Sequence, residues 1–243
     1  MAMRSDVLKN LRAMPDPGRA LENYRRMAPA YESSCRRIQA LRELAVQHLS
    51  LKAGETVFDL ACGTGATLPS LSRDVGPEGL AVGVEQCPEM AELARQRIKT
   101  LTASARIAIV QGAVETFEPD ARADAVLMCF AHDVLQSPAA LQRLLAIGKP
   151  GARVVLLGLR TLPWWWAWPL NLFNLFRARR YLTTYAGMAR PWQLLASRGA
   201  AFEVIDSALW SSIYIAVGRL PGSTGADTAL VSRHAPDGPG LYF

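Results

Sequence analysis

The chain has 243 residues, half of them hydrophobic, and a formal net charge of +6 at pH 7. This content is ample for the core of one large domain, or of one domain with an insertion. The basic balance suits an anionic surface or substrate, but no run of Arg or Lys is long enough to predict a nucleic-acid partner.

The cysteines form no C-x-x-C pair, which indicates a reduced, cytoplasmic protein. The first six residues lack the apolar core of a signal peptide. The histidines are scattered and no carboxylates gather at ligand spacing, so we expect no metal site. The four cysteines are Cys35, Cys62, Cys87 and Cys129.

The predicted elements alternate along most of the chain. Residues 18–50 are expected to be mostly helical, since apolar residues recur there at helical spacing. Strands are predicted at 56–61, 80–85, 106–111, 123–130 and 153–159, and helices at 65–73, 88–100 and 138–147. This alternation predicts a parallel sheet with helices on both faces. Two β-rich runs, 201–209 and 211–219, predict an antiparallel hairpin.

The first predicted strand leads into a turn with two glycines, Gly63 and Gly65, and Glu85 ends the next strand. An acid at that place after a glycine turn is typical of a nucleoside-binding βαβ unit. A dinucleotide site would need a third glycine, but Leu68 occupies that position. Asp59, just before the turn, would repel a phosphate and attract a cation. The turn therefore favours a cationic nucleoside over a dinucleotide.

The pattern Asp59-x-Ala61-x-Gly63-x-Gly65 resembles motif I of the class I methyltransferases that depend on S-adenosylmethionine (SAM). The family often has glycine where Ala61 stands. The resemblance covers roughly residues 20–219. It implies SAM as the cofactor and a Rossmann-like, doubly wound, mostly parallel seven-stranded sheet with an antiparallel terminal hairpin.

The resemblance also implies a cofactor site, with Glu85 accepting hydrogen bonds from the ribose hydroxyls. Gly112 follows the third strand in what looks like the adenine-contact segment. The family often has an acid next to that glycine, where this chain has Ala113, so backbone groups are expected to serve instead. Met90 lies where an apolar residue often contacts adenine, or it is a core residue. The implied cofactor residues are Tyr24, Asp59, Ala61, Cys62, Gly63, Thr64, Gly65, Glu85, Gln86, Met90, Gly112, Ala113, Val114, Cys129 and Phe130.

The two catalytic candidates are His132 and Tyr31. His132 follows the fourth strand and can act as a base, since an imidazole titrates near neutrality, or it can bond to the backbone where a helix begins. Asp133 is expected to start that helix. Tyr24 and Tyr31 resemble a family segment that folds over the cofactor. Their spacing of seven gives them one helix face, either a lid face or a packing face, unless Pro29 breaks the helix.

Residues 162–176 form an aromatic insertion with four of the six tryptophans. It is too short to span a bilayer, which needs about 20 apolar residues. On a helix, Asn171, Asn174 and Arg177 would form a polar stripe. The insertion predicts either peripheral membrane contact or a lid whose tryptophans pack on the core. The candidate substrate residues are Trp164, Trp165, Trp168, Tyr181, Thr184 and Tyr185.

These expectations give five segments: a helical lid at 1–50, a SAM-binding core at 51–160, the insertion at 161–190, a last helix and hairpin at 191–219, and a flexible tail at 220–243. We predict a SAM-dependent methyltransferase acting on a hydrophobic or amphiphilic small molecule, a class that includes membrane lipids. The layout is similar to bacterial phospholipid N-methyltransferases and quinone C-methyltransferases. The alternatives are methylation of a soluble aromatic metabolite or quinone, and a non-catalytic SAM-binding sensor or partner subunit.

Overall fold

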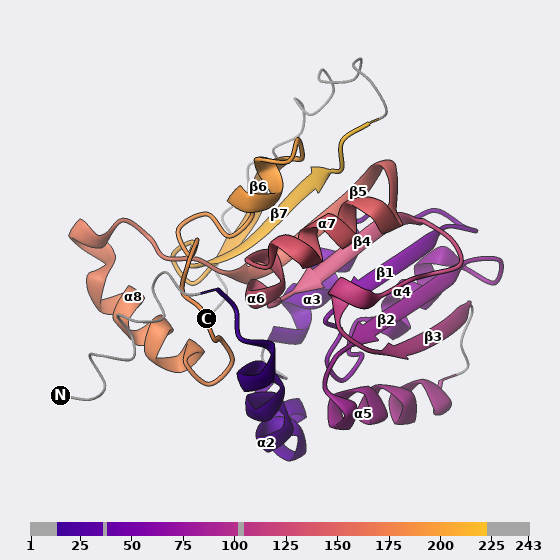
Figure 1. Cartoon of the computed structure of the whole chain (residues 1–243), viewed down its shortest axis with the longest axis horizontal. Coiled ribbons are helices and arrows are strands. Elements are labelled where there is room, and N and C mark those ends of the chain that lie inside the picture. The colour runs from indigo at the N-terminus through magenta and orange to yellow at the C-terminus, as the bar shows by residue number, and fades with distance from the viewer. Residues whose placement is uncertain (1–13, 36–37, 102–104, 223–243) are drawn as a thin grey trace.

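The computed structural model of the chain describes residues 14–35, 38–101 and 105–222, with the backbone alone at 29–30 and 32–35 (Figure 1). The predictions for residues 1–13 and for the tail after 222 lie outside the described residues.

A seven-stranded sheet forms the centre, in the order β3-β2-β1-β4-β5-β7-β6. The first five strands pair in parallel, and β7 is antiparallel to both of its neighbours. The predicted doubly wound sheet with an antiparallel terminal hairpin is confirmed. The strands are β1 (Thr56–Leu60), β2 (Leu80–Glu85), β3 (Arg106–Gln111), β4 (Ala123–Cys129), β5 (Gly148–Leu159), β6 (Ala201–Ala208) and β7 (Ile213–Arg219).

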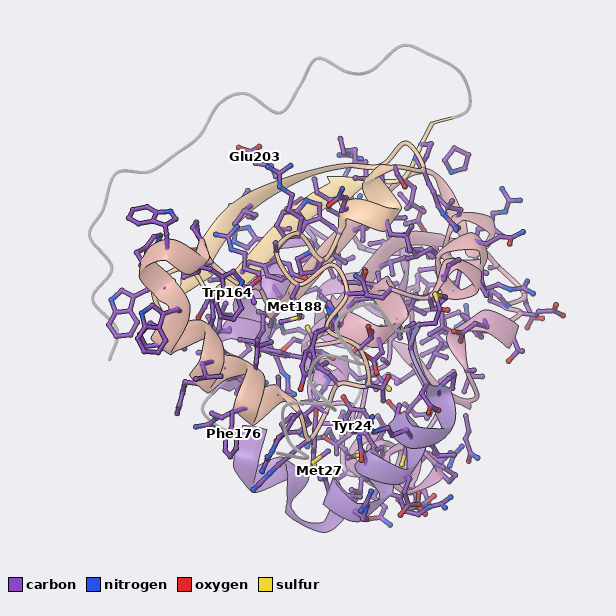
Figure 2. The ribbon with its side chains drawn as sticks, turned by 60° about the vertical axis from the view of Figure 1, so that its left-hand side comes forward. Tyr24, Met27, Trp164, Phe176, Met188 and Glu203 are labelled. Atoms are coloured by element: carbon purple, nitrogen blue, oxygen red, sulfur yellow. The ribbon has the colours of Figure 1, made fainter. Side chains whose placement is uncertain are left out.

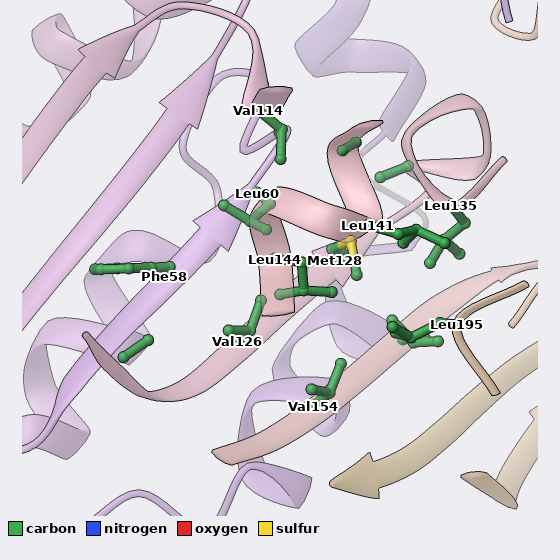
Figure 3. Close-up of a cluster of buried hydrophobic side chains, with 14 of the residues drawn as sticks. Phe58, Leu60, Val114, Val126, Met128, Leu135, Leu141, Leu144, Val154 and Leu195 are labelled. Carbon is green, nitrogen blue, oxygen red and sulfur yellow. The ribbon is translucent and has the colours of Figure 1, made fainter. Parts of the chain in front are cut away.

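Helices cover both faces of the sheet, so each face has its own apolar core. On one face, Leu141 and Leu144 pack over Phe58, Val126 and Met128 (Figure 3). The helices are α2 (Pro17–Cys35), α3 (Gln39–His48), α4 (Leu68–Val75), α5 (Pro88–Lys99), the 3-10 helix η2 (Val114–Thr116), α6 (His132–Leu135), α7 (Pro138–Ile147), α8 (Trp164–Ala178) and α9 (Gln193–Ala196). On the other face the core includes Ala45, Val46, Leu49, Leu68, Leu71 and Val75 of α3, its C-terminal end and α4.

Two element starts differ from the sequence predictions by three residues or more, and one considered helix break is absent. The helix expected at 65 begins at Leu68, because Gly63 and Gly65 have φ of 57° and 70° and keep the chain in a turn. Strand β5 begins at Gly148 instead of 153, since Gly148 already pairs with Ala123 of β4. Helix α2 runs through Pro29 without a break.

The orientation of α8 also differs from one of the two interpretations of the insertion. Its four tryptophans are roughly half to almost fully exposed, so the lid that packs them on the core is wrong. The polar stripe does not face water either. Asn171 is fully buried and Asn174 nearly so, and both face the protein.

Candidate functional site

The main pocket lies at the carboxyl ends of the parallel strands. Residues from β2 and from the loops after β1, β3 and β4 line it, together with residues of α2 and the segment after α8. The strand order reverses between β1 and β4, where chains leave toward opposite sides, and open α/β sheets bind ligands at such a point. The implied site residues in this lining are Tyr24, Tyr31, Ala61, Gly63, Glu85, Gln86, Gly112, Val114, Cys129, Phe130, His132 and Tyr181.

The turn after β1 is built from left-handed backbone. Ala61 has φ of 61°, a conformation that costs an alanine more than a glycine. At Gly63 an added Cβ would meet only the Tyr31 ring, at 3.8 Å, and at Gly112 it would meet nothing within 4 Å. Both glycines therefore border open space where a ligand can approach the backbone. Gly65 serves packing instead, because a Cβ there would lie 2.9 Å from the Leu68 side chain.

Glu85 is held rigidly between the ends of β1 and β2. Its Oε2 accepts from the Gly63 N–H at 2.9 Å, and its Oε1 accepts from the Cys87 N–H at 2.8 Å. Burial raises the pKa of this carboxyl, and the two backbone donors oppose that rise. Each oxygen keeps a further lone pair, so the carboxylate can accept hydrogen bonds from a ligand.

Asp59 lies in a small side cavity and not in the main lining. This cavity shares Tyr31, Ala61, Gly63 and Cys129 with the main pocket and also contacts Arg42. Oδ2 of Asp59 accepts from the Thr67 hydroxyl, whereas its buried Oδ1 has no hydrogen-bond partner in the described part of the chain. Burial raises the pKa of Asp59 to about 6. An orphaned carboxylate oxygen beside a ligand pocket fits a cationic donor.

Three tyrosines close the pocket on the side of α2. Tyr24, Tyr31 and Tyr181 have ring centroids 6.2–6.4 Å apart, and all three line the pocket. The shared face of Tyr24 and Tyr31 thus borders the pocket and also packs against the buried cluster of Ala28, Cys87 and Met90. Helix α2 is linked to α5 by Arg25, whose Nε donates to the Glu89 carboxylate at 2.8 Å.

His132 and Asp133 lie at the start of α6. Burial lowers the pKa of His132 to about 4, and the Ala186 backbone opposes this only weakly. Neither ring nitrogen makes a hydrogen bond of normal geometry to any described residue. The sequence suggested that Asp133 starts α6 as a capping residue, but its carboxylate makes no capping hydrogen bond to that helix. It accepts from the Thr183 N–H and hydroxyl, at 3.0 and 2.6 Å, and so holds the segment after α8.

The pocket is acidic although the chain is basic. Among the described lining residues there are four carboxylates and no Lys or Arg. Such a lining favours neutral or cationic ligands over phosphates and carboxylates. The four acids are Asp16, Glu85, Glu115 and Asp133.

Comparison with known proteins agrees with this geometry. Residues 57–151 match the family described as a methyltransferase domain. The chain is 31% identical over 141 residues to a 2-phytyl-1,4-naphtoquinone methyltransferase of Nostoc punctiforme, covering 55% of this chain and 61% of that protein. It is 30% identical over 118 residues to the ubiquinone/menaquinone biosynthesis C-methyltransferase UbiE of Pseudomonas fluorescens, covering 48% of this chain and 46% of that protein.

Solved structures show the same fold. A SAM-dependent methyltransferase of Aquifex aeolicus superposes with a TM-score of 0.56 at 19% identity, over 84% of this chain and 97% of that one. The N-methyltransferase NodS of Bradyrhizobium japonicum superposes with a TM-score of 0.55 at 15% identity, over 76% of this chain and 98% of that one. Residues 57–151 thus belong to a methyltransferase domain family, and the fold around them is that of SAM-dependent methyltransferases. The chain spans about three fifths or less of the length of the first curated relatives it matches.

The pocket fits SAM, the cofactor of this methyltransferase family. SAM carries a sulfonium, an ammonium and ribose hydroxyls but no phosphate, and the pocket offers carboxylates and no described cationic side chain. Of the pocket carboxylates, Glu85 is oriented at the strand edge. The adjoining side cavity adds Asp59, whose Oδ1 has no hydrogen-bond partner among the described residues, and it is also lined by Arg42. The open space above Gly63 and Gly112 leaves room for a ligand against the backbone.

Several predicted site residues do not line the methyltransferase pocket. Met90 is fully buried in a cluster with Ala28 and Cys87, which is the core position left open above. The tryptophans of α8 lie on the outer surface. The predicted residues outside the main pocket are Asp59, Cys62, Thr64, Gly65, Met90, Ala113, Trp164, Trp165, Trp168, Thr184 and Tyr185, of which Asp59 and Cys62 line the side cavity.

Four residues of the site were missed by the sequence analysis. Glu115, in the lining, stands two places after Ala113 and accepts from the Ser137 hydroxyl at 2.7 Å. Its place beside the expected adenine segment was the available signal. Asp16 caps α2 by accepting from the Arg19 N–H, and its own N–H donates to the Thr183 hydroxyl. Thr183 and Arg42 carried no local signal, because their partners are distant in sequence.

Proposed function

We propose that this protein is an enzyme that transfers a methyl group from SAM to a hydrophobic or amphiphilic small molecule, a class that includes membrane lipids. The observation that carries the proposal is that acidic and apolar groups line one connected site. Glu85 and the neighbouring Asp59 cavity supply acceptors, and Leu21, Leu182 and the tyrosine cluster supply an apolar, aromatic wall.

In this proposal Glu85 would hold the ribose hydroxyls, Asp59 Oδ1 the ammonium, and the segment Gly112–Glu115 the adenine. When bound, SAM supplies a methyl group activated by its sulfonium. The protein's own contribution is to position the two reactants and to exclude water, and positioning is worth up to roughly 7–11 kcal/mol in the best intramolecular cases. Tyr24, Tyr31 and Tyr181 cover the pocket and provide that exclusion.

His132 is our candidate for the proton acceptor, ahead of Tyr31. A pKa near 4 keeps its imidazole neutral at pH 7, so a ring nitrogen can accept a hydrogen bond from the acceptor molecule. Proton transfer to it requires that the bound reactants raise this pKa toward the working pH. Its lack of a regular hydrogen-bond partner among the described residues leaves that nitrogen available. Tyr31 instead forms part of the wall between the main pocket and the side cavity.

The names of the relatives support an acceptor with a ring and an apolar chain. One is named for a phytyl naphthoquinone and another for ubiquinone and menaquinone biosynthesis. A quinone is therefore our second candidate acceptor. We place the reaction in the cytoplasm at a membrane surface. The free thiols of Cys62, Cys87 and Cys129 support a reducing compartment, and the exposed aromatic face of α8 supports a peripheral membrane contact. No described helix is long and apolar enough to cross a bilayer.

The test is a transfer assay with methyl-labelled SAM and three acceptor panels: phospholipids, quinones, and soluble aromatic metabolites. We expect label in an apolar product, and a lower kcat in the His132→Asn variant with SAM affinity preserved. Label in soluble products alone would favour the aromatic-metabolite alternative. Tight SAM binding with no product from any panel would favour a non-catalytic sensor and contradict the proposal.

A further inference from the structure

Helix α8 has its apolar side turned toward solvent. Apart from Arg177 in its last turn, the large exposed side chains of this helix are apolar, while the buried ones include two asparagines. A surface helix of a globular protein normally shows the opposite arrangement. In Figure 2 the indole rings of this helix project away from the rest of the molecule. The large exposed apolar side chains are Trp164, Trp165, Trp166, Trp168, Leu172, Phe173 and Phe176.

Specific contacts fix this orientation. The Asn171 carboxamide accepts from the Leu162 N–H at 2.9 Å and donates to the Leu162 carbonyl at 2.8 Å. On the same inner side, Leu175 and Ala178 pack with Leu182 and Tyr185. Rotation of the helix to bury its tryptophans would break both hydrogen bonds in a buried site, where each unmade bond is costly. The outward apolar face is therefore a built feature of the fold.

A second segment, distant in sequence, completes the surface. Leu209 and Trp210, in the turn between β6 and β7, are exposed, Trp210 to 75%. They line a shallow groove together with Trp166 and Phe173 of α8. The turn has left-handed backbone at Leu209, Trp210 and Ser211, held by Arg160, whose Nε donates to the Ser211 carbonyl at 2.7 Å. We name the exposed apolar side chains of α8 with Leu209 and Trp210 the docking surface.

The stretch of sequence that contains α8 is basic, although three of its cations, Arg143, Lys149 and Arg153, form ion pairs away from this surface. Residues 134–202 contain nine Lys and Arg and no Asp or Glu, which leaves 18 basic residues against all 21 acidic ones elsewhere. Arg177 and Arg179 lie over the rings of Phe173 and Phe176, at 5.6 and 3.9 Å from the ring centres. Arg180 follows at once. Cationic side chains thus border the docking surface directly.

We propose that the docking surface inserts into the interfacial layer of an anionic phospholipid bilayer, with α8 lying along the membrane plane. Tryptophan favours this layer because its ring is apolar and its N–H polar, and arginine beside it can meet lipid phosphates. With 15 residues, α8 is too short to span the bilayer, which needs about 20. A symmetric contact between two copies would bring the two arginine clusters together, so charge favours the bilayer.

The role of this membrane contact, delivery of an apolar acceptor, rests on the proposed function, but the geometry of the docking surface does not depend on it. Leu182 packs against Leu175 and Ala178 of α8 and also lines the main pocket. Tyr181, beside it, belongs to the tyrosine cluster over that pocket. A bilayer contact at α8 would therefore place the apolar wall of the pocket, to which Leu182 and Tyr181 belong, close to lipid. An apolar acceptor could then reach the pocket without crossing water.

The test is co-sedimentation of the full chain with vesicles of phosphatidylcholine alone or mixed with phosphatidylglycerol. We expect binding to the mixed vesicles that weakens as salt rises, since salt screens the arginines. The double variant Trp165→Ser/Trp210→Ser is expected to bind at least roughly tenfold more weakly, because each indole loses its apolar burial. Arg177→Glu/Arg180→Glu should weaken binding as well. The control Arg106→Glu, on the opposite edge strand β3, should not.

Calorimetry with SAM, without vesicles, is run on the same preparations. Normal SAM affinity with no vesicle binding by the wild type would overturn the membrane inference and leave the proposed function intact. Equal vesicle binding by the tryptophan double variant would overturn it too. A self-association of the wild type that the tryptophan variant loses, without vesicle binding, would show that a second copy covers the surface.

Discussion

The Glu85 carboxylate joins the ends of two adjacent strands at the pocket, because its two oxygens accept the N–H groups of Gly63 and Cys87. We predict that Glu85→Ala weakens SAM binding by roughly 10- to 100-fold, the loss typical of a hydrogen bond to a charged group. Glu85→Gln should lose less, since it keeps one acceptor. Calorimetry measures both, with the exposed Glu92→Ala as control. Unchanged affinity in a folded Glu85→Ala variant would remove Glu85 from the site.

Asp59 and His132 are expected to change stability with pH in opposite directions. The pKa of Asp59 is raised to about 6, so its stabilising contribution is present at low pH and lost as pH rises through 6. The pKa of His132 is lowered to about 4, so its contribution is present above about 6.5 and lost as pH falls toward 4.

The neutral variants separate these two contributions. As pH rises from low values to 7, the free energy of unfolding of Asp59→Asn should increase relative to wild type by up to about 3 kcal/mol. As pH falls from 7 to 5, that of His132→Asn should increase relative to wild type by up to about 2 kcal/mol. Urea unfolding across this range measures both differences. The same sign of change in the two variants would contradict the burial argument. Asp59→Asn should also bind SAM less tightly, because it removes the charge that faces the ammonium.

Ala61 occupies a backbone conformation that suits glycine, with φ of 61°. We predict that Ala61→Gly raises the free energy of unfolding by about 0.5–1 kcal/mol, after the entropic cost of glycine is subtracted. Ala146→Gly, on the exposed side of helix α7, should lower the free energy of unfolding by a similar amount and is the matched control. Denaturant unfolding measures both. A destabilised Ala61→Gly variant would show that the turn is not strained.

At the scale of elements, Thr183 links the start of α2 to α6. Its hydroxyl accepts from the Asp16 N–H at 2.9 Å, just before α2, and donates to the Asp133 carboxylate at 2.6 Å. We predict that Thr183→Val speeds amide hydrogen exchange in α2 and weakens SAM binding. Mass spectrometry of exchange measures the first effect, with Thr100→Val, whose hydroxyl bonds only within its own helix end, as control. Unchanged exchange in α2 would show that this helix is held by its other contacts.

The elements were largely predictable because their signals are local. The apolar runs that form β1 to β4 and the Pro88 and Pro138 helix starts lie within single segments. The direction of α8 was not predictable. Helical spacing groups Asn171 with Asn174, but only the Leu162 backbone, bonded across the turn before the helix, decides that this side is inside. The Asp133–Thr183 contact likewise joins residues 50 positions apart.

At the scale of the whole molecule, the pocket and the docking surface carry charges of opposite sign. The pocket lining has four acids, whereas the docking surface is bordered by arginines. In our proposal the pocket attracts a cationic cofactor while the outer face attracts an anionic bilayer. The turn at Asp59–Gly65 and Glu85 allowed the cofactor to be predicted from sequence. The acceptor was not predictable, because its wall is assembled from α2 and the segment after α8, which meet only in the fold.

Transfer of labelled methyl from SAM to acceptors dispersed in anionic bilayers tests the central claim most directly. The assay compares wild type, Glu85→Ala and the Arg106→Glu control, and label in the extracted apolar fraction is counted. We predict labelled apolar product from wild type and from the control, and little from Glu85→Ala. A wild-type protein that binds SAM but labels no apolar acceptor would contradict the account.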